Sequence, residues 1–139
     1  MEIIAVETQM RALLKTVGYL PTGTPVEPAP YSEDLPYPAV IYKLLTPEAD
    51  TIMIGGNVVM STLDYLVVAE TVGQNSYDLI PYVNGIRQAL QGNGGTNTYG
   101  TVFTFQRIRP FSLAYRAASG KTMQQSGYVF QCRAQGIYT

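Results

Sequence analysis

Residues 124–135, near the end of the chain, alternate small or apolar side chains with polar ones, and this pattern constrains the fold most. A period of two is typical of a β-strand, whose successive side chains point to opposite faces of a sheet. The inward face is expected to hold Ser126, Tyr128, Phe130, Cys132 and Ala134. The outward face is expected to hold Val129, Gln131, Arg133 and Gln135. The chain must therefore build a sheet with one buried face.

Residues 58–72 predict a second long strand by the same alternation. Its more apolar face carries Val59, Leu63, Tyr65, Val67 and Ala69. The opposite face mixes Met60, Thr62, Asp64, Leu66, Val68 and Glu70. We expect the first face to be buried and the second to be partly covered.

Two segments with apolar residues at three- and four-residue spacing predict helices, over 3–17 and 77–91. Gly18 and Gly92 are expected to end them, because glycine adopts the left-handed conformation that closes many helices. Ser76 or Asp78 is expected to cap the second helix, with Pro81 in its first turn. The apolar stripe of this helix is expected to hold Leu79, Ile80, Val83, Ile86 and Leu90.

The remaining segments complete an α+β fold in one domain spanning residues 1–139. Further strands are expected at 39–45, 101–109 and 111–118, with Pro110 separating the last two. Long loops are expected at 21–38, which holds six prolines, at 46–57 and at 92–100. The resulting order is α-β-β-α-β-β-β. It predicts an antiparallel or mixed sheet with both helices on one face.

Charge is scarce and unevenly distributed along the chain. Charged residues make up 14% of the sequence, against roughly 25% in typical soluble domains. Residues 1–78 carry all ten acids and three basic residues, whereas residues 79–139 carry six basic residues and no acid. If the two halves occupy different faces, the molecule has one acidic and one basic side. Such a molecule favours head-to-tail contacts. If the elements interleave, the field averages out. The 11 tyrosines suit either a protein interface or ordinary strands.

The residues that most enzymes and metal sites need are scarce. The chain has no histidine and one cysteine, so a histidine-activated nucleophile and a cysteine–histidine zinc site are both excluded. Gly120-Lys121-Thr122 lacks the earlier glycine of a phosphate-binding loop, since Tyr115 stands there. We predict no enzyme activity, no cofactor and no metal. The lone thiol permits no disulfide within the chain, no run is long enough to span a membrane, and the N-terminus lacks a signal peptide's basic region. We therefore expect assembly in the cytoplasm.

Arginines in the later strands are the most suggestive functional residues. Arg107 and Arg109 flank Ile108, so they are expected to project from one face of a strand, and Arg133 could join them. Such a group could contact a phosphate backbone or the carboxylates of a partner, or be ordinary strand surface.

The layout of almost the whole chain resembles one family. A first helix and a proline-rich loop precede the run Leu35-Pro36-Tyr37-Pro38-Ala39-Val40-Ile41-Tyr42. A long strand containing residues 63–69 follows, then a helix from Ser76 to Leu90 and a closing strand containing residues 127–131. This order resembles the tail terminator, or tail completion, proteins of long-tailed bacteriophages. Loops 46–57 and 92–100 are its least family-like parts.

The resemblance implies a non-enzymatic virion subunit that assembles in the host cytoplasm into a hexameric ring. Such a ring caps the tail tube, ends its polymerisation, joins the tail to the head connector and lets DNA pass through its lumen. The lumen or subunit interface would then involve Arg107, Arg109, Lys121 and Arg133. The loops that would contact the tail tube and connector proteins hold Tyr31, Tyr37, Glu48, Asp50, Ile52 and Met53. The alternatives are a head-side neck or stopper protein and a small ligand-binding domain.

Overall fold

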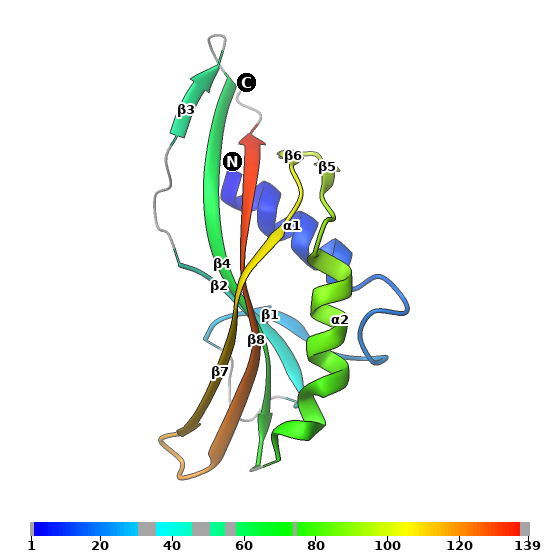
Figure 1. Ribbon diagram of the computed structural model, residues 1–139, viewed down its shortest axis with the longest axis vertical. Helices are drawn as coiled ribbons and strands as arrows, with labels where there is room; N and C mark the ends of the chain where they lie inside the picture. The colour runs from blue at the N-terminus through cyan, green and yellow to red at the C-terminus, as the bar shows by residue number, and fades with distance from the viewer. Residues whose placement is uncertain (1, 31–35, 46–50, 55–57, 74, 137–139) are drawn as a thin grey trace.

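The computed structural model describes residues 2–30, 36–45, 51–54, 58–73 and 75–136, with the side chains of 51–54, 58, 59 and 76 excepted. Two long antiparallel strands, β4 (Val58–Val72) and β8 (Thr122–Gly136), form its centre. They pair from Val59 with Gly136 to Val72 with Met123 and run along the long axis in Figure 1. Both strands predicted from alternation are therefore confirmed.

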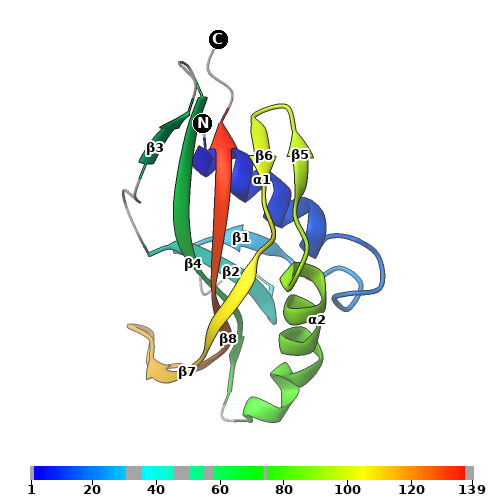
Figure 2. The same ribbon diagram turned by 45° about the horizontal axis from the view of Figure 1, so that its top comes forward.

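Shorter strands lie in tandem along both outer sides of this central pair. β2 (Ala39–Leu44) and β3 (Thr51–Ile54) pair with β4, while β6 (Gly100–Val102) and β7 (Gln106–Arg116) pair with β8. β1 (Val26–Pro28) adds to β2 in parallel, and β5 (Gly95–Asn97) adds to β6. The result is one eight-stranded mixed sheet, which Figure 2 shows from another side.

The helices cover one face of the sheet, as the sequence predicts. α1 (Glu2–Leu14) and α2 (Ile80–Leu90) lie on the same side in Figures 1 and 2, and a short 3₁₀ turn, η1 (Ser76–Leu79), leads into α2. The predicted caps are wrong: Asn75, not Ser76 or Asp78, accepts a hydrogen bond from the Tyr77 backbone N–H. Ile80 was predicted to lie in the apolar stripe of the helix, but it is 49% exposed. The 3₁₀ turn shifts the start of α2 to this residue.

The core lies between the helices and the inward faces of β4 and β8. It contains Leu63, Tyr65, Val67 and Ala69 of β4 and Phe130, Cys132 and Ala134 of β8. The expected inward faces are confirmed for these residues, and Tyr128 packs against the cluster while partly exposed. Ser126 is only partly buried, and the side chain of Val59 lies outside the described ones. Val68 and Glu70, on the opposite face of β4, are also buried, so that face is covered more fully at this end than expected.

Several predicted loops contain strands. β1 lies within 21–38, β3 within 46–57 and β5 within 92–100. Each pairs on only one side within the described residues, which suits short strands with proline or glycine nearby. The predicted break at Pro110 is wrong, because β7 runs through this residue. β7 lies at the border of the sheet, where a missing N–H need not interrupt a ladder.

Burial of two weak acids in the core makes the stability of the fold sensitive to high pH. Burial raises the pKa of the Cys132 thiol to about 12, and burial with the nearby Glu7 carboxylate raises the pKa of the Tyr65 hydroxyl, which donates to Glu7 Oε2 at 3.0 Å. The unfolded chain ionises these groups near their ordinary pKa values of about 8.5 and 10. The folded chain keeps them protonated, so their contribution is full at neutral pH and is lost as pH rises above about 9.

We therefore expect the free energy of unfolding to fall by up to about 1.4 kcal/mol per pH unit for each group above its ordinary pKa. Urea unfolding followed by circular dichroism from neutral to alkaline pH measures this. Cys132→Ala is the control, and its stability should decline less steeply with pH. An equal decline in both proteins would contradict a contribution from the thiol.

Candidate assembly surface

Strand β7 is exposed along almost its whole length. Every residue of this strand is exposed except Phe111, which is half-buried. Within the described residues β7 pairs only with β8, so its other edge carries no neighbouring strand. An edge of this length is a natural place for another polypeptide to bind.

A bulge in β7 separates the two arginines that the sequence predicts on one face. Arg107 pairs with Phe130 and Arg109 with Val129, with the register shift between them. Because Phe130 and Val129 point to opposite faces, Arg107 lies on the helix side and Arg109 on the far side. The prediction that the two arginines project from one face is therefore wrong, because the extra residue of a bulge reverses the alternation that follows it.

Arg107, the arginine on the helix side, makes two contacts within the protein. The Arg107 backbone N–H donates to Gln91 Oε1 at 2.8 Å, and its guanidinium lies 5.2 Å from the centre of the Tyr128 ring. This cation–π contact fixes the side chain against the sheet. Arg107 is thus as much a structural residue as an assembly candidate.

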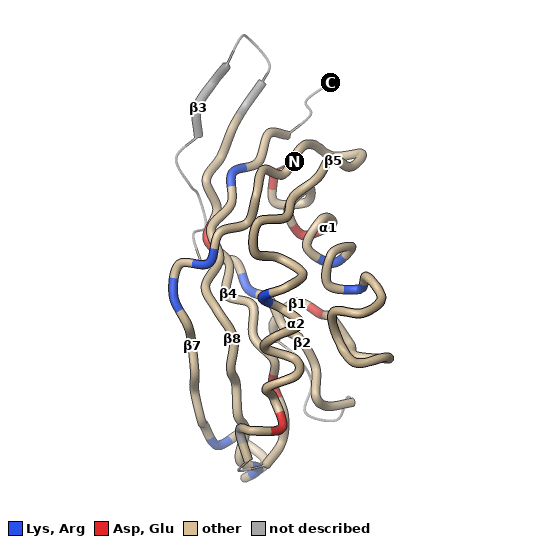
Figure 3. Tube along the Cα trace, turned by 45° about the vertical axis from the view of Figure 1, so that its right-hand side comes forward, with Lys and Arg blue, Asp and Glu red and all other residues tan. Residues whose placement is uncertain are grey.

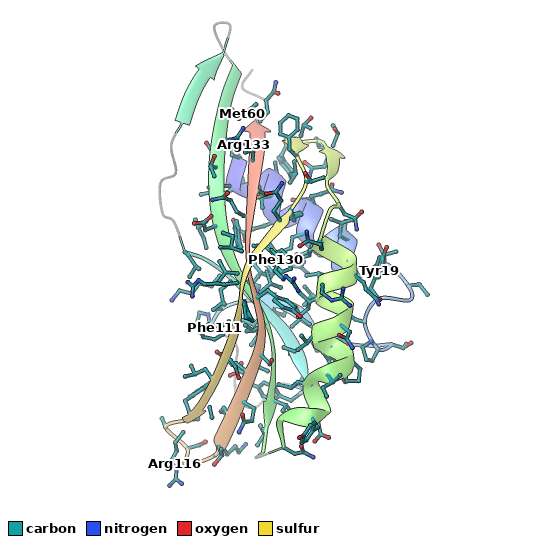
Figure 4. The ribbon with its side chains drawn as sticks, viewed as in Figure 1. Tyr19, Met60, Phe111, Arg116, Phe130 and Arg133 are labelled. Atoms are coloured by element: carbon teal, nitrogen blue, oxygen red, sulfur yellow. The ribbon has the colours of Figure 1, made fainter. Side chains whose placement is uncertain are left out.

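The other predicted basic residues do not form one cluster. Arg109 and Arg133 share the far face but lie four residues apart along β8, about 13 Å. Figure 4 shows Arg133 and Arg116 near opposite ends of the long axis. Lys121 lies in the turn between β7 and β8, near Arg116. The structure therefore spreads the basic residues along β7 and β8 and over both faces of the sheet.

Charge changes sign across the sheet. Glu27 lies on β1, and Asp64 and Glu70 lie on β4, which is central. Arg133 lies on the adjacent β8, and Arg107, Arg109 and Arg116 lie on β7 at the opposite edge. Figure 3 shows basic positions towards both ends of β7. Lys43 on β2 departs from the trend. The halves of the chain interleave at β4 and β8, yet the β7 edge remains basic.

The expected partner-contacting loops are only partly described. Tyr31, Glu48 and Asp50 lie outside the described residues. Ile52 and Met53 lie in β3, where their backbones pair with Met60 and Val59, and their side chains are not described. Tyr37 is half-buried just before β2. These residues stay predictions.

An apolar stripe on β7 is the part of this surface that sequence reasoning missed. Phe111, Leu113 and Tyr115 share the far face with Arg109, because they pair with alternate residues of β8. Leu113 is 44% and Tyr115 37% exposed. Tyr115 is anchored, because its hydroxyl donates to the buried Glu70 carboxylate, which also accepts from Gln125. The alternation of residues 111–115 was the available signal.

The described hollows offer little to a small ligand that needs acid–base groups. One of about 320 Å³ lies where β6 leaves β8, lined by Phe103, Thr104, Gln106, Gln131, Cys132 and Arg133. Two others, of about 280 and 310 Å³, lie after α1 and between α2 and β7. None of these three is lined by a carboxylate. Among the described residues no group of three potential metal-ligating side chains occurs, and no helix is long and apolar enough to cross a membrane.

Comparison with known proteins gives a structural match over nearly the whole chain. No protein-family model matches the sequence, and the search of curated proteins found no match. The fold is similar to that of a chain in a solved structure described as the virion of a native gene transfer agent (GTA) particle. The two are 18% identical, the match covers 96% of this chain and 97% of the other, and the TM-score is 0.70. At this identity the likeness shows a shared fold, across nearly the whole length of both chains.

Proposed function

We propose that this chain is a structural protein of a phage-like particle and forms a ring that caps the tail tube. The ring ends polymerisation of the tube and joins the tail to the head connector. One observation carries the proposal: this chain has the same fold as a chain from a gene transfer agent virion. The match covers 96% of this chain and 97% of the other.

The distribution of charge and chemistry supports the same proposal. The sheet has a basic edge at β7, while its acidic residues lie on the central strand β4 and, as Glu27, on the opposite edge strand β1. This arrangement favours head-to-tail contacts. Head-to-tail contacts close into a ring when their rotation allows it. The sequence resemblance to tail terminators supplies the position in the particle and the expected ring of six.

The first test is the solution mass of the purified chain by light scattering over a range of protein and salt concentrations. We expect a closed oligomer of about six subunits that weakens as salt rises, because screening reduces contacts between exposed charges. Electron microscopy of tail tubes mixed with the protein should show density at tube ends. A chain that remains monomeric and leaves tube ends bare would contradict the proposal. Binding to head connectors but not to tubes would favour the neck protein instead.

A further inference from the structure

The free edge of β7 presents a defined set of backbone groups. The Ala117 N–H donates to the Lys121 carbonyl at 2.8 Å, which makes these two residues a hydrogen-bonded pair. Hydrogen-bonded and non-hydrogen-bonded pairs alternate along an antiparallel ladder. Phe111, Leu113 and Tyr115 therefore direct their backbone groups to β8. The backbone groups of Ser112, Ala114 and Arg116 face the open side.

The two halves of this edge differ in their protection. Residues 106–110 carry the bulge, Pro110 and two arginines, which are the devices that proteins use to block a sheet edge. Pro110 falls in the outward-facing set, where it removes the N–H that a new strand would need. Residues 111–116 have no proline and no bulge, and they carry the apolar stripe of Phe111, Leu113 and Tyr115. By contrast, strand β1 is preceded by Pro25 and ends with Pro28.

Charge indicates what such an edge accepts. Arg109, Arg116 and Lys121 surround the open half, and none of them forms an ion pair within the described residues. A second β7 would bring the same positive charges to the contact, and like charges facing each other across an interface are unfavourable. The first 78 residues of the chain, with ten acids and three basic residues, are complementary instead.

We propose that residues 111–116 of β7 accept an extended segment from the acidic first half, residues 1–78, of a second copy. The incoming strand adds to the sheet through the backbone groups of Ser112, Ala114 and Arg116 and covers the apolar stripe. Strand addition of this kind takes affinity from the main chain and specificity from alternate side chains. The contact is head-to-tail, so this inference rests on the proposed ring and names its subunit interface.

The test compares Ala114→Pro with Ala114→Val in the full chain. Proline removes one outward N–H, as Pro110 already does four residues earlier, whereas valine keeps the N–H and suits a strand. We expect Ala114→Val to assemble as the wild type does. Ala114→Pro should raise the concentration for half-assembly about tenfold or more. Light scattering measures assembly, and circular dichroism checks that both variants fold.

A photo-crosslinking side chain at Ser112 provides a measurement independent of the proline variant. In a mixture of ¹⁵N-labelled and unlabelled chains, crosslinked peptides between copies should map to residues 1–78. Crosslinks between copies only to residues 79–139 would overturn the inference, as would wild-type assembly by folded Ala114→Pro. Either result leaves the ring itself standing. A chain that stays monomeric yet caps tubes overturns the inference alone, whereas no assembly and bare tube ends overturn both proposals.

Discussion

Phe105→Ala is expected to lower the free energy of unfolding by about 3–5 kcal/mol. Phe105 is fully buried in the short segment between β6 and β7, and it joins the core beneath α2. Its backbone is fixed on both sides, because its N–H donates to the Asn93 carbonyl and its carbonyl accepts from the Gly92 N–H, each at 2.9 Å. The surrounding chain therefore has little freedom to collapse into the cavity. Urea unfolding followed by circular dichroism measures the loss.

Phe103→Ala is the matched control, because Phe103 lies two residues away and is 42% exposed. We expect a loss of about 1 kcal/mol or less for this variant, since half-exposed apolar side chains contribute little transfer energy. Equal losses at the two positions would show that Phe105 does not anchor the passage from β6 to β7.

Gly127→Ala is expected to cost about 3 kcal/mol, at the upper end of typical overpacking penalties. A Cβ atom at this position would lie 2.2 Å from the Val67 carbonyl oxygen and 2.7 Å from the Val68 Cα. Both contacts are to backbone in the adjacent central strand, so no side-chain rotation relieves them. The two long strands must separate locally, which weakens their ladder.

Ser126→Ala is the control for Gly127→Ala, because Ser126 occupies the next position on β8 and already has a Cβ atom. We expect it to unfold within about 0.5 kcal/mol of the wild type. Thermal unfolding by calorimetry compares the three proteins. A Gly127→Ala variant as stable as Ser126→Ala would mean that the close approach of β8 to β4 is not required.

Alternating patterns sustained over long stretches of the sequence predicted most of the architecture. The alternation over 58–72 and 124–135 gave both central strands and the correct inward faces, because one buried face imposes a strict period of two. The helix caps were less accessible. The choice between Asn75, Ser76 and Asp78 depends on a 3₁₀ turn that packing against β8 and α2 supports.

The candidate surface was harder to predict than the fold. The arginines of β7 lie at an edge of the sheet because of the order of the strands. The sequence leaves that order open. The bulge that separates Arg107 from Arg109 depends on the register against β8 and breaks the alternation used to place them. Proline was interpreted as a strand break because the neighbour on its outward side was unknown. Once β7 is known to be an edge, the same residue marks where pairing is blocked.

The paired ladder of β4 and β8 has a mechanical consequence. Each strand has 15 residues, so at about 3.3 Å per residue the paired strands are roughly 50 Å long. The end that pairs with β3 and the end that turns into β7 belong to the same hydrogen-bonded strip. Neither end can advance along the axis without slipping the whole register, which would turn every inward side chain outward. The protein therefore holds the surfaces at its two ends at a fixed spacing.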